Sequence, residues 1–166
     1  QGNGGKDTIY IAGQVAADST VYGGQGNDSI TLASSASAAT LAGNLGKDTI
    51  EVTNRVKAGT SIYGGSINDT SLDGADSITL AEQLSASWIQ GNGGGDTISV
   101  NGGKISSSTI YGGQGDDSIR YVAGGGSLNT STVQGNLGSD TLFLSNTNAL
   151  LSSTIYGSDS TGTITG

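Results

Sequence analysis

The sequence lacks several residue types on which common functional sites depend. Its 166 residues contain no Cys, His, Met or Pro. Leu, Ile, Val and Phe together make up only about a fifth of the chain, which is close to the range of intrinsically disordered proteins. Without Cys or His, the chain forms no disulfide, offers no thiolate or imidazole to a metal ion, and has no histidine for acid–base catalysis. Any metal site must therefore be built from oxygen ligands.

Basic residues are scarce as well. Six Lys and Arg stand against 14 Asp and Glu, a formal net charge of −8. Nucleic-acid binding needs a Lys- and Arg-rich surface, so we expect no nucleic-acid partner and an affinity for cations. No apolar run reaches the roughly 18 residues that suggest a membrane span, and the first residues lack the features of a signal peptide. No catalytic constellation stands out, so we expect no enzyme.

The chain is instead built from an internal repeat. Glycine-rich tracts recur at intervals of 20 to 23 residues, with one interval of 27, and begin at Gly2, Gly23, Gly43, Gly64, Gly91, Gly112, Gly135 and Gly157. The long interval contains an insertion at residues 66–72, after which Asp73-Gly74-Ala75-Asp76 restores the pattern. We therefore predict about eight coils in a single domain, 1–166, which is a fragment of a longer repeat protein or an assembling unit.

Each repeat contains two short segments with the pattern of a β-strand. After each tract, apolar residues alternate with polar ones, as in Ile30 and Leu32, and this period of two is typical of strands. A second short strand precedes each tract and places Val21, Leu41 or an equivalent residue inward. One such unit is too small to bury its apolar side alone, so neighbouring units must stack. The sequence predicts an all-β fold, a single-chain parallel β-solenoid.

Half of the acidic residues share one position in the repeat. In stacked coils, seven aspartates would form a column about 5 Å apart, which costs about 1 kcal/mol per neighbouring pair in water and several at a lower dielectric. Gly-rich turns closed by Asp also occur without metal, and Lys6 and Lys47 could neutralise two members. A row of Ca²⁺ ions is the better partner, because calcium takes six to eight carboxylate and carbonyl oxygens. The column is Asp7, Asp28, Asp48, Asp76, Asp96, Asp117 and Asp140.

The loops resemble those of a known family. Residues 23–31 (GGQGNDSIT) and 112–120 (GGQGDDSIR) look like full matches to the G-G-x-G-x-D-x-U-x nonapeptide of the RTX, or hemolysin-type, calcium-binding proteins. The resemblance implies a β-roll with calcium bound between loops. RTX coils usually carry the motif on both edges, whereas one motif per coil here implies one calcium row. The last tract has Gly162 in place of the loop Asp, so we expect weak or no binding there.

Glycine and asparagine residues complete the expected metal loops. Asparagine replaces the second glycine in alternate coils and tolerates the left-handed backbone region, so we expect both types of loop to turn alike. The residues expected to supply backbone to the ions are Gly2, Asn3, Gly23, Gly24, Gly26, Gly43, Asn44, Gly46, Gly64, Gly65, Gly74, Gly91, Asn92, Gly94, Gly112, Gly113, Gly115, Gly135, Asn136 and Gly138.

These features lead to an expected function. We expect a calcium-dependent extracellular structural protein of a surface layer, filament or adhesin, which associates end to end or laterally. Its folding would be driven by Ca²⁺, and the RTX resemblance implies type I secretion. The alternatives are a calcium-binding module that aids secretion and folding of a secreted enzyme, and a ligand- or ice-binding adhesin module.

One further pattern lies on the expected outer surface. Tyr22, Tyr63, Tyr111 and Tyr156 recur in every second coil and point outward, next to a column of Thr and Ser that Trp88 interrupts. An aromatic stripe of this kind suits a cell-surface polysaccharide or another partner, but tyrosine also simply packs along sheet surfaces.

Overall fold

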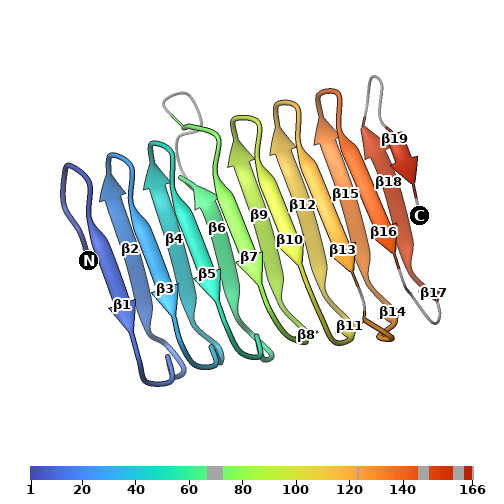
Figure 1. Ribbon diagram of the computed structural model, residues 1–166, viewed down its shortest axis with the longest axis horizontal. Helices are drawn as coiled ribbons and strands as arrows, with labels where there is room; N and C mark the ends of the chain where they lie inside the picture. Colours follow the sequence, from blue (N-terminus) through green and yellow to red (C-terminus); the bar gives the residue numbers. More distant parts are fainter. Residues whose placement is uncertain (67–72, 123, 146–149, 159–162, 166) are drawn as a thin grey trace.

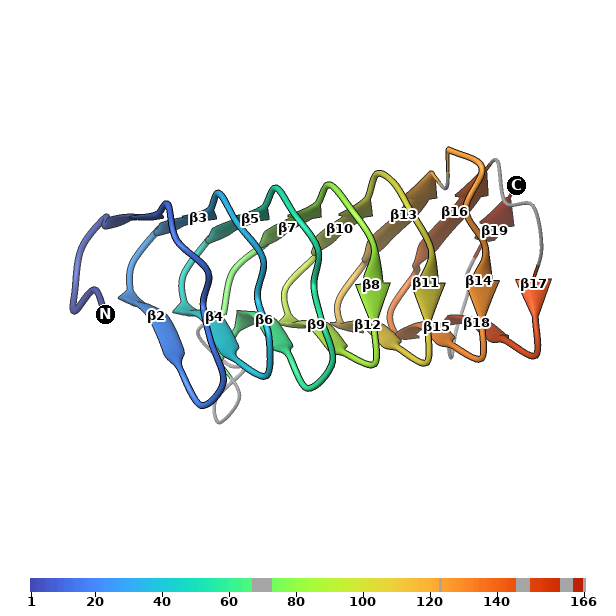
Figure 2. The ribbon, with the colours of Figure 1, turned by 90° about the horizontal axis from the view of Figure 1, so that it is seen from below.

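The computed structural model describes residues 1–66, 73–122, 124–145, 150–158 and 163–165, and all regular secondary structure in them is β. Every strand pairing within its three sheets is parallel and joins equivalent positions of neighbouring repeats, for example Ile30 with Ile50. The chain winds into a rod whose coils follow one another along a single axis (Figures 1 and 2). The predicted parallel β-solenoid is confirmed.

The first sheet contains the strands that follow the glycine-rich loops. Its eight strands, in spatial order, are β1 (Thr8–Ile11), β3 (Ser29–Leu32), β5 (Thr49–Val52), β7 (Ser77–Leu80), β10 (Thr97–Val100), β13 (Ser118–Val122), β16 (Thr141–Ser145) and β19 (Thr163–Thr165).

The second sheet contains the strands that lead into the loops. Its seven strands, in the same direction along the rod, are β2 (Thr20–Gln25), β4 (Thr40–Leu45), β6 (Ser61–Gly65), β9 (Trp88–Gly93), β12 (Thr109–Gln114), β15 (Thr132–Leu137) and β18 (Thr154–Ser158).

A third, narrow sheet joins the other two on the side away from the loops, and the sequence did not predict it. It consists of β8 (Leu84–Ser85), β11 (Ile105–Ser106), β14 (Leu128–Asn129) and β17 (Leu150–Leu151). Single bridges at Val15, Ala36 and Val56 extend the same column toward the amino terminus. Each strand is too short to show an alternation, and Ala36 is a weak apolar signal.

The number of turns also differs from the prediction. The second and third sheets each have seven positions along the rod, while the first has eight. The rod therefore has about seven full turns, which span about 34 Å at one strand spacing per coil, rather than eight. Counting glycine tracts overestimates the number, because a tract marks one corner and a full turn needs all three sides.

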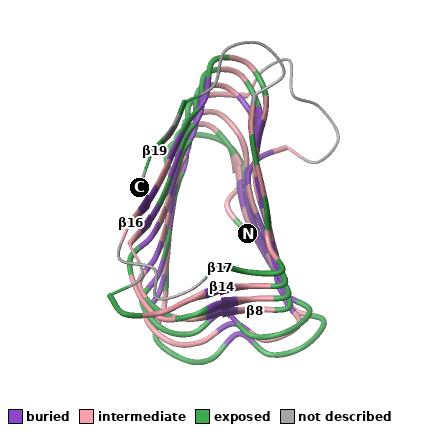
Figure 3. Ribbon diagram, turned by 90° about the vertical axis from the view of Figure 1, so that its right-hand side faces the viewer, coloured by how far each residue is buried: buried purple, intermediate pink, exposed green. Residues whose placement is uncertain are grey.

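The three sheets enclose a thin triangular core (Figure 3). In a full coil, two side chains from the first sheet and one from each of the others point inward; Ile50, Val52, Val56 and Ile62 are each at most 1 % exposed. Burial of an aliphatic side chain of this size contributes about 1.5–3 kcal/mol. The Gly loops form one corner of the triangle, termed here the glycine edge. The corner between the third and second sheets, at residues 18–19 and their equivalents, is termed the serine corner.

The structure describes little of the predicted insertion. Of residues 66–72 it describes only Ser66, and residues 159–162 of the last tract also lie outside the described part of the chain. Within the described ranges, no helix has the length and apolarity needed to cross a membrane.

Candidate metal-binding edge

The seven aspartates lie in one column along the glycine edge. Each immediately precedes a strand of the first sheet, and its carbonyl oxygen accepts a hydrogen bond from the neighbouring coil; Ser29 N donates to Asp7 O at 2.9 Å, and Thr49 N to Asp28 O at 2.9 Å. The parallel register therefore brings together all seven aspartates that the repeat pattern predicts to form one column. Asp7, in the first coil, is partly exposed, whereas the other six are 1–3 % exposed.

In the six carboxyl groups that follow Asp7 in this column, one oxygen joins adjacent coils. The backbone N–H of Asp28 donates to Oδ1 of Asp48 at 2.6 Å, and that of Asp48 donates to Oδ1 of Asp76 at 2.7 Å. The same bond recurs from Asp7 to Asp28, Asp76 to Asp96, Asp96 to Asp117 and Asp117 to Asp140, at 2.7–2.9 Å. Oδ1 thus has a structural role that needs no metal.

The second oxygen is different. Oδ2 of Asp28, Asp48, Asp76, Asp96 and Asp117 is buried and accepts no hydrogen bond. In the incomplete first turn, by contrast, Oδ2 of Asp7 accepts a bond from Asn3 N at 3.2 Å. A buried polar group without a partner is costly, and a buried charge without one costs more. Five successive coils repeat this cost at one position.

Each of these oxygens lies beside the first glycine of its own loop, and a main-chain carbonyl oxygen of the next coil lies beside the same glycine. A Cβ added to Gly23 would lie 2.6 Å from both Asp28 Oδ2 and the carbonyl oxygen of Gly43, and one added to Gly64 would lie 2.7 Å from Asp76 Oδ2 and 2.9 Å from Gly91 O. The first glycine of the tract is therefore required by close approach. It leaves room where a carboxylate oxygen and a carbonyl oxygen converge.

The residues that follow the first glycine of each tract form the turn itself. Gly26 has a φ of 114°, and a Cβ there would overlap the carbonyl group of Gly5. Asn44, Asn92 and Asn136 have φ of 78–83°, which confirms the left-handed backbone expected for them. Asn3 does not adopt it; this residue lies in the first turn, where only one neighbouring coil pairs with the loop.

Burial changes the acidity of the column. Burial raises the pKa of Asp76 from 3.8 to about 9, against the opposing effect of the hydrogen bond from Asp48 N–H, and the charges of Asp96, Asp73 and Asp48 raise it further. For the same reasons the pKa is raised to about 7 in Asp96 and Asp117 and to about 6 in Asp48. The side-chain charges that act on these groups are those of other aspartates.

Comparison with protein-family models, with curated proteins and with solved structures gives no match to this chain. The likeness to RTX proteins therefore depends on the loop motifs and on a fold compatible with a β-roll. Within the part of the chain described, no group of three or more acidic residues is close enough to hold one ion. An ion at this edge would thus take one or two carboxylates and complete its shell with carbonyl oxygens and water, a donor set that suits calcium.

In the loop that contains the insertion, an aspartate outside the periodic column supplies a hydrogen-bond acceptor to the next coil. Asp73 follows the insertion, and its Oδ2 accepts a hydrogen bond from Gly93 N at 3.2 Å, whereas the equivalent Gln25 N donates to the backbone carbonyl of Asn3 at 2.9 Å. Asn92 Nδ2 in turn donates to Gly65 O at 2.9 Å. Periodicity could not find Asp73, because no other coil has an equivalent.

Two other kinds of loop residue were missed. Gly5 has the same loop position and left-handed backbone as Gly26, with a φ of 102°, and the alignment of tracts contained the signal for it. Asn27 and Asp116 lie just before the aspartate column, and each Oδ1 accepts a backbone N–H from the next coil, at 3.0 and 2.8 Å. Their identities vary between coils, so no pattern marked them.

Proposed function

We propose that this protein is a calcium-dependent extracellular structural rod, of the kind found in surface layers, filaments or adhesins. Its folding would be completed by Ca²⁺ binding between stacked glycine-rich loops. One observation carries the proposal: Oδ2 is buried and accepts no hydrogen bond in five successive aspartates of the glycine edge. Without a cation, this column combines desolvation with repulsion between neighbours.

A divalent cation removes both costs at once. Protons can neutralise the column only one residue at a time, and the raised pKa values show that ionisation at neutral pH is opposed by burial. A doubly charged ion offsets two carboxylates. Asp28 with the carbonyl of Gly43, and Asp76 with that of Gly91, are the residues that would hold such ions. Carboxylate and carbonyl oxygens favour calcium, whose coordination geometry is variable, over magnesium, which demands a tight octahedron.

Coupling of folding to calcium binding is consistent with export of an unfolded chain that folds outside the cell. A chain that cannot form the aspartate column without calcium stays unfolded where calcium is scarce and folds where it is abundant. This behaviour suits a protein that leaves the cell unfolded and becomes rigid outside it, as the type I secretion implied by the RTX resemblance requires. The rod shape itself suits a spacer or an assembling unit.

Circular dichroism of the chain, with and without calcium, tests the proposal. We expect a disordered spectrum in excess chelator and a β spectrum after calcium is added, with magnesium much less effective. The Asp96→Asn variant should need more calcium than the native protein. Glu51→Gln is the matched control, because Glu51 is exposed on the outer face of β5 and should leave the titration unchanged. A β spectrum that strong chelation does not alter would contradict the proposal.

Electron microscopy tests the structural role separately. If the protein forms a layer or filament, calcium should induce regular sheets or fibres at concentrations that complete the circular dichroism change. Particles that fold with calcium but remain single would retain the calcium-dependent fold and overturn the assembly part of the proposal.

A further inference from the structure

A shallow hollow lies beside the serine corner, on the outer surface and well away from the aspartate column. Its volume is about 300 Å³, and its lining includes Thr60, Ser61, Ser107 and Thr109 next to Trp88. No charged residue lines it. The hydroxyl of Thr60 is buried, and its oxygen makes no hydrogen bond. The hollow therefore combines one large aromatic ring with a group of hydroxyl side chains.

Trp88 is an exception in its column. The residues at this position in the other strands of the second sheet are Thr or Ser, and Trp88 pairs with Ser61 on one side and Thr109 on the other. It is the only tryptophan of the chain, and 36 % of it remains exposed. A large apolar ring placed outward in a row of small polar residues contributes nothing to the core. An outward indole, which combines an apolar ring with a polar N–H, suits contact with a partly polar ligand.

The indole ring is held in a fixed orientation. Its centroid lies 4.9 Å from that of Tyr111, in an edge-to-face arrangement with an interplanar angle of 86°. Its Nε1–H donates to Oε1 of Gln90 at 3.1 Å. Gln90 and Tyr111 are themselves paired across β9 and β12. Because the ring is already ordered, a ligand that stacks on it loses little additional side-chain entropy.

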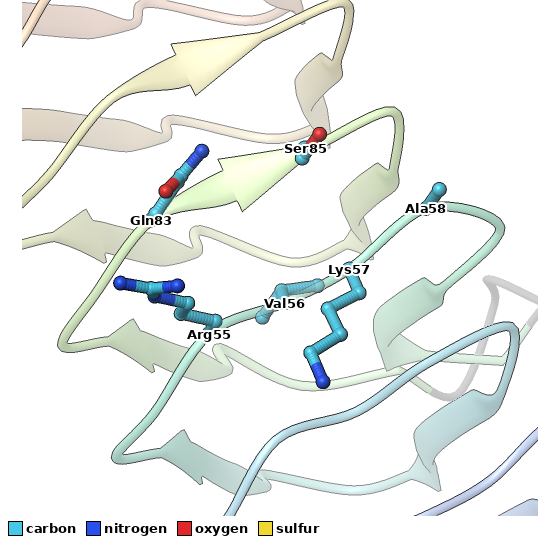
Figure 4. A pocket seen from close by; sticks show the side chains of 6 residues that line it. All are labelled: Arg55, Val56, Lys57, Ala58, Gln83 and Ser85. Carbon is cyan, nitrogen blue, oxygen red and sulfur yellow. The ribbon is translucent and has the colours of Figure 1, made fainter.

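We propose that the Trp88 hollow binds a neutral carbohydrate. The flat indole suits the apolar C–H face of a pyranose ring, and the accessible side chains of Ser61, Ser107 and Thr109 suit its hydroxyl groups. The lining is too polar for the core of a protein interface and carries no cation for a phosphate, carboxylate or sulfate group. Arg55 and Lys57 lie at a separate hollow on the third sheet (Figure 4). The proposal goes beyond the calcium-dependent rod, and its ligand site contains none of the candidate calcium ligands.

Intrinsic fluorescence provides a selective test, because the protein has one tryptophan. We would titrate the calcium-loaded protein with cellotetraose, a linear sugar whose rings present flat C–H faces, and excite at the red edge of the absorption band, where tyrosine does not absorb. Chitotetraose and maltotetraose serve as further probes of linkage and substituent. We expect a saturable change in Trp88 emission with at least one of these sugars.

Variants then test whether the sugar binds at the Trp88 indole ring. Trp88→Thr restores the residue type of the neighbouring strands and should fold like the native protein, which circular dichroism checks. In isothermal titration calorimetry it should bind the sugar about tenfold more weakly or not measurably, as expected for loss of an aromatic contact. Tyr111→Leu should weaken binding less, since it removes only the support of the ring. Lys57→Ala, in the separate basic hollow, should leave binding unchanged.

Three results would overturn this proposal. The first is a folded native protein whose tryptophan emission responds to none of the three sugars at millimolar concentrations. The second is equal sugar binding by Trp88→Thr. The third is a fall in oligomer size on Trp88→Thr in analytical ultracentrifugation, without sugar binding by the native protein, which would identify the hollow as a contact between copies of this chain. None of these results bears on the calcium titration, so the two proposals fail separately.

Discussion

Two corners of this solenoid join adjacent coils through the same type of hydrogen bond, from a backbone N–H to a side-chain oxygen. They differ in the side-chain polar atoms that are left without a partner. At the serine corner, Ser87 N donates to Oγ of Ser108, and Ser108 N donates to Oγ of Ser131, each at 3.2 Å. At the glycine edge, the N–H of each aspartate donates to Oδ1 of the aspartate in the next coil. In both columns a side-chain oxygen of one coil fixes the backbone of its neighbour.

The two columns differ in whether the side chain can itself donate a hydrogen bond. The Ser108 hydroxyl donates its own proton to Ser106 O at 2.8 Å, and that of Ser131 to Asn129 O at 2.8 Å, so each serine is satisfied as donor and acceptor. An ionised carboxylate has no proton to donate and retains a second buried oxygen. At Ser108 and Ser131 the serine corner is therefore complete with protein atoms alone, while the glycine edge retains a buried oxygen without a partner in five successive coils. This comparison gives an order of expected effects.

The largest effect should come from filling the space that the glycine edge keeps open. In Gly43→Ala, the new Cβ would overlap Asp48 Oδ2 and the carbonyl oxygen of Gly64. We expect a loss of about 3 kcal/mol or more in the free energy of unfolding, with calcium affinity reduced as well. Gly4→Ala is the matched control, because a Cβ there meets nothing within 4 Å. Urea denaturation in calcium measures both, and equal stability of the two variants would contradict the description of the edge.

The second effect should change sign with calcium. Asp96→Asn keeps the Oδ1 acceptor for Asp76 N–H but removes a buried charge. In chelator we expect the variant to be more stable or more ordered than the native protein, and in calcium less stable, because a ligand charge is lost. Circular dichroism in chelator, where the native protein should be disordered, and thermal unfolding in calcium measure this.

Ser108→Ala provides the comparison at the other corner. It leaves the N–H of Ser87 without its acceptor and should cost about 1–3 kcal/mol. The loss should be the same at the lowest calcium concentration that supports folding and at saturating calcium. A calcium-dependent loss for Ser108→Ala, or a calcium-independent one for Asp96→Asn, would remove the distinction between the two corners.

The third effect concerns pH in the absence of calcium. The pKa of Asp48, Asp76, Asp96 and Asp117 is raised from 3.8 to between about 6 and about 9 in the folded state. The folded column therefore binds more protons than the unfolded chain in this range, and stability must fall as pH rises through it. Whatever fold persists in chelator should be most stable near pH 4 and least stable near pH 9. A chelated protein whose stability rises over this range would contradict the account, and saturating calcium should flatten the profile.

The smallest effect should be a gain at the serine corner. Thr130 precedes Ser131 and has a φ of 49°, an unfavourable value for a β-branched residue, while Gly59 takes the same place in an earlier coil. Thr130→Gly should raise the free energy of unfolding by up to about 1 kcal/mol, since relief of strain exceeds the entropy that glycine adds to the unfolded chain. Chemical denaturation measures the change, and a loss above about 1 kcal/mol would show that the Thr130 side chain, which contacts Asn129 at 3.1 Å, matters more than its backbone.

The two corners were also unequally predictable. The glycine edge was visible in the sequence because Asp28 and its equivalents recur at one position beside glycines, and because Ile30 and Leu32 alternate with polar residues. The serine corner was not, because Ser19, Ala39 and Thr60 occupy the positions where later coils have Ser. Its left-handed residues, apart from Gly59, are not glycines, and residues such as Ala38 and Ala86 give no turn signal.

Side-chain chemistry within the predicted column could not be inferred either. The repeat placed the aspartates one coil apart, but only the structure divides the carboxyl groups of Asp28, Asp48, Asp76, Asp96 and Asp117 into a bonded Oδ1 and a buried Oδ2 without a hydrogen bond. Tyr121 is a similar case: it replaces the expected aliphatic residue in β13, is buried, and donates its hydroxyl to Gly103 O at 2.7 Å. Which groups a buried polar side chain reaches is decided by packing between coils, and the repeat pattern does not contain this information.

We propose that calcium occupies the glycine edge beside Oδ2 of the buried aspartates. Anomalous X-ray diffraction from crystals grown in calcium tests it most directly. We expect a row of anomalous peaks along this edge, one coil spacing apart, each within bonding distance of an aspartate Oδ2. A well-ordered solenoid with no peaks there, and with calcium only at exposed acids such as Glu51 or Glu82, would contradict it.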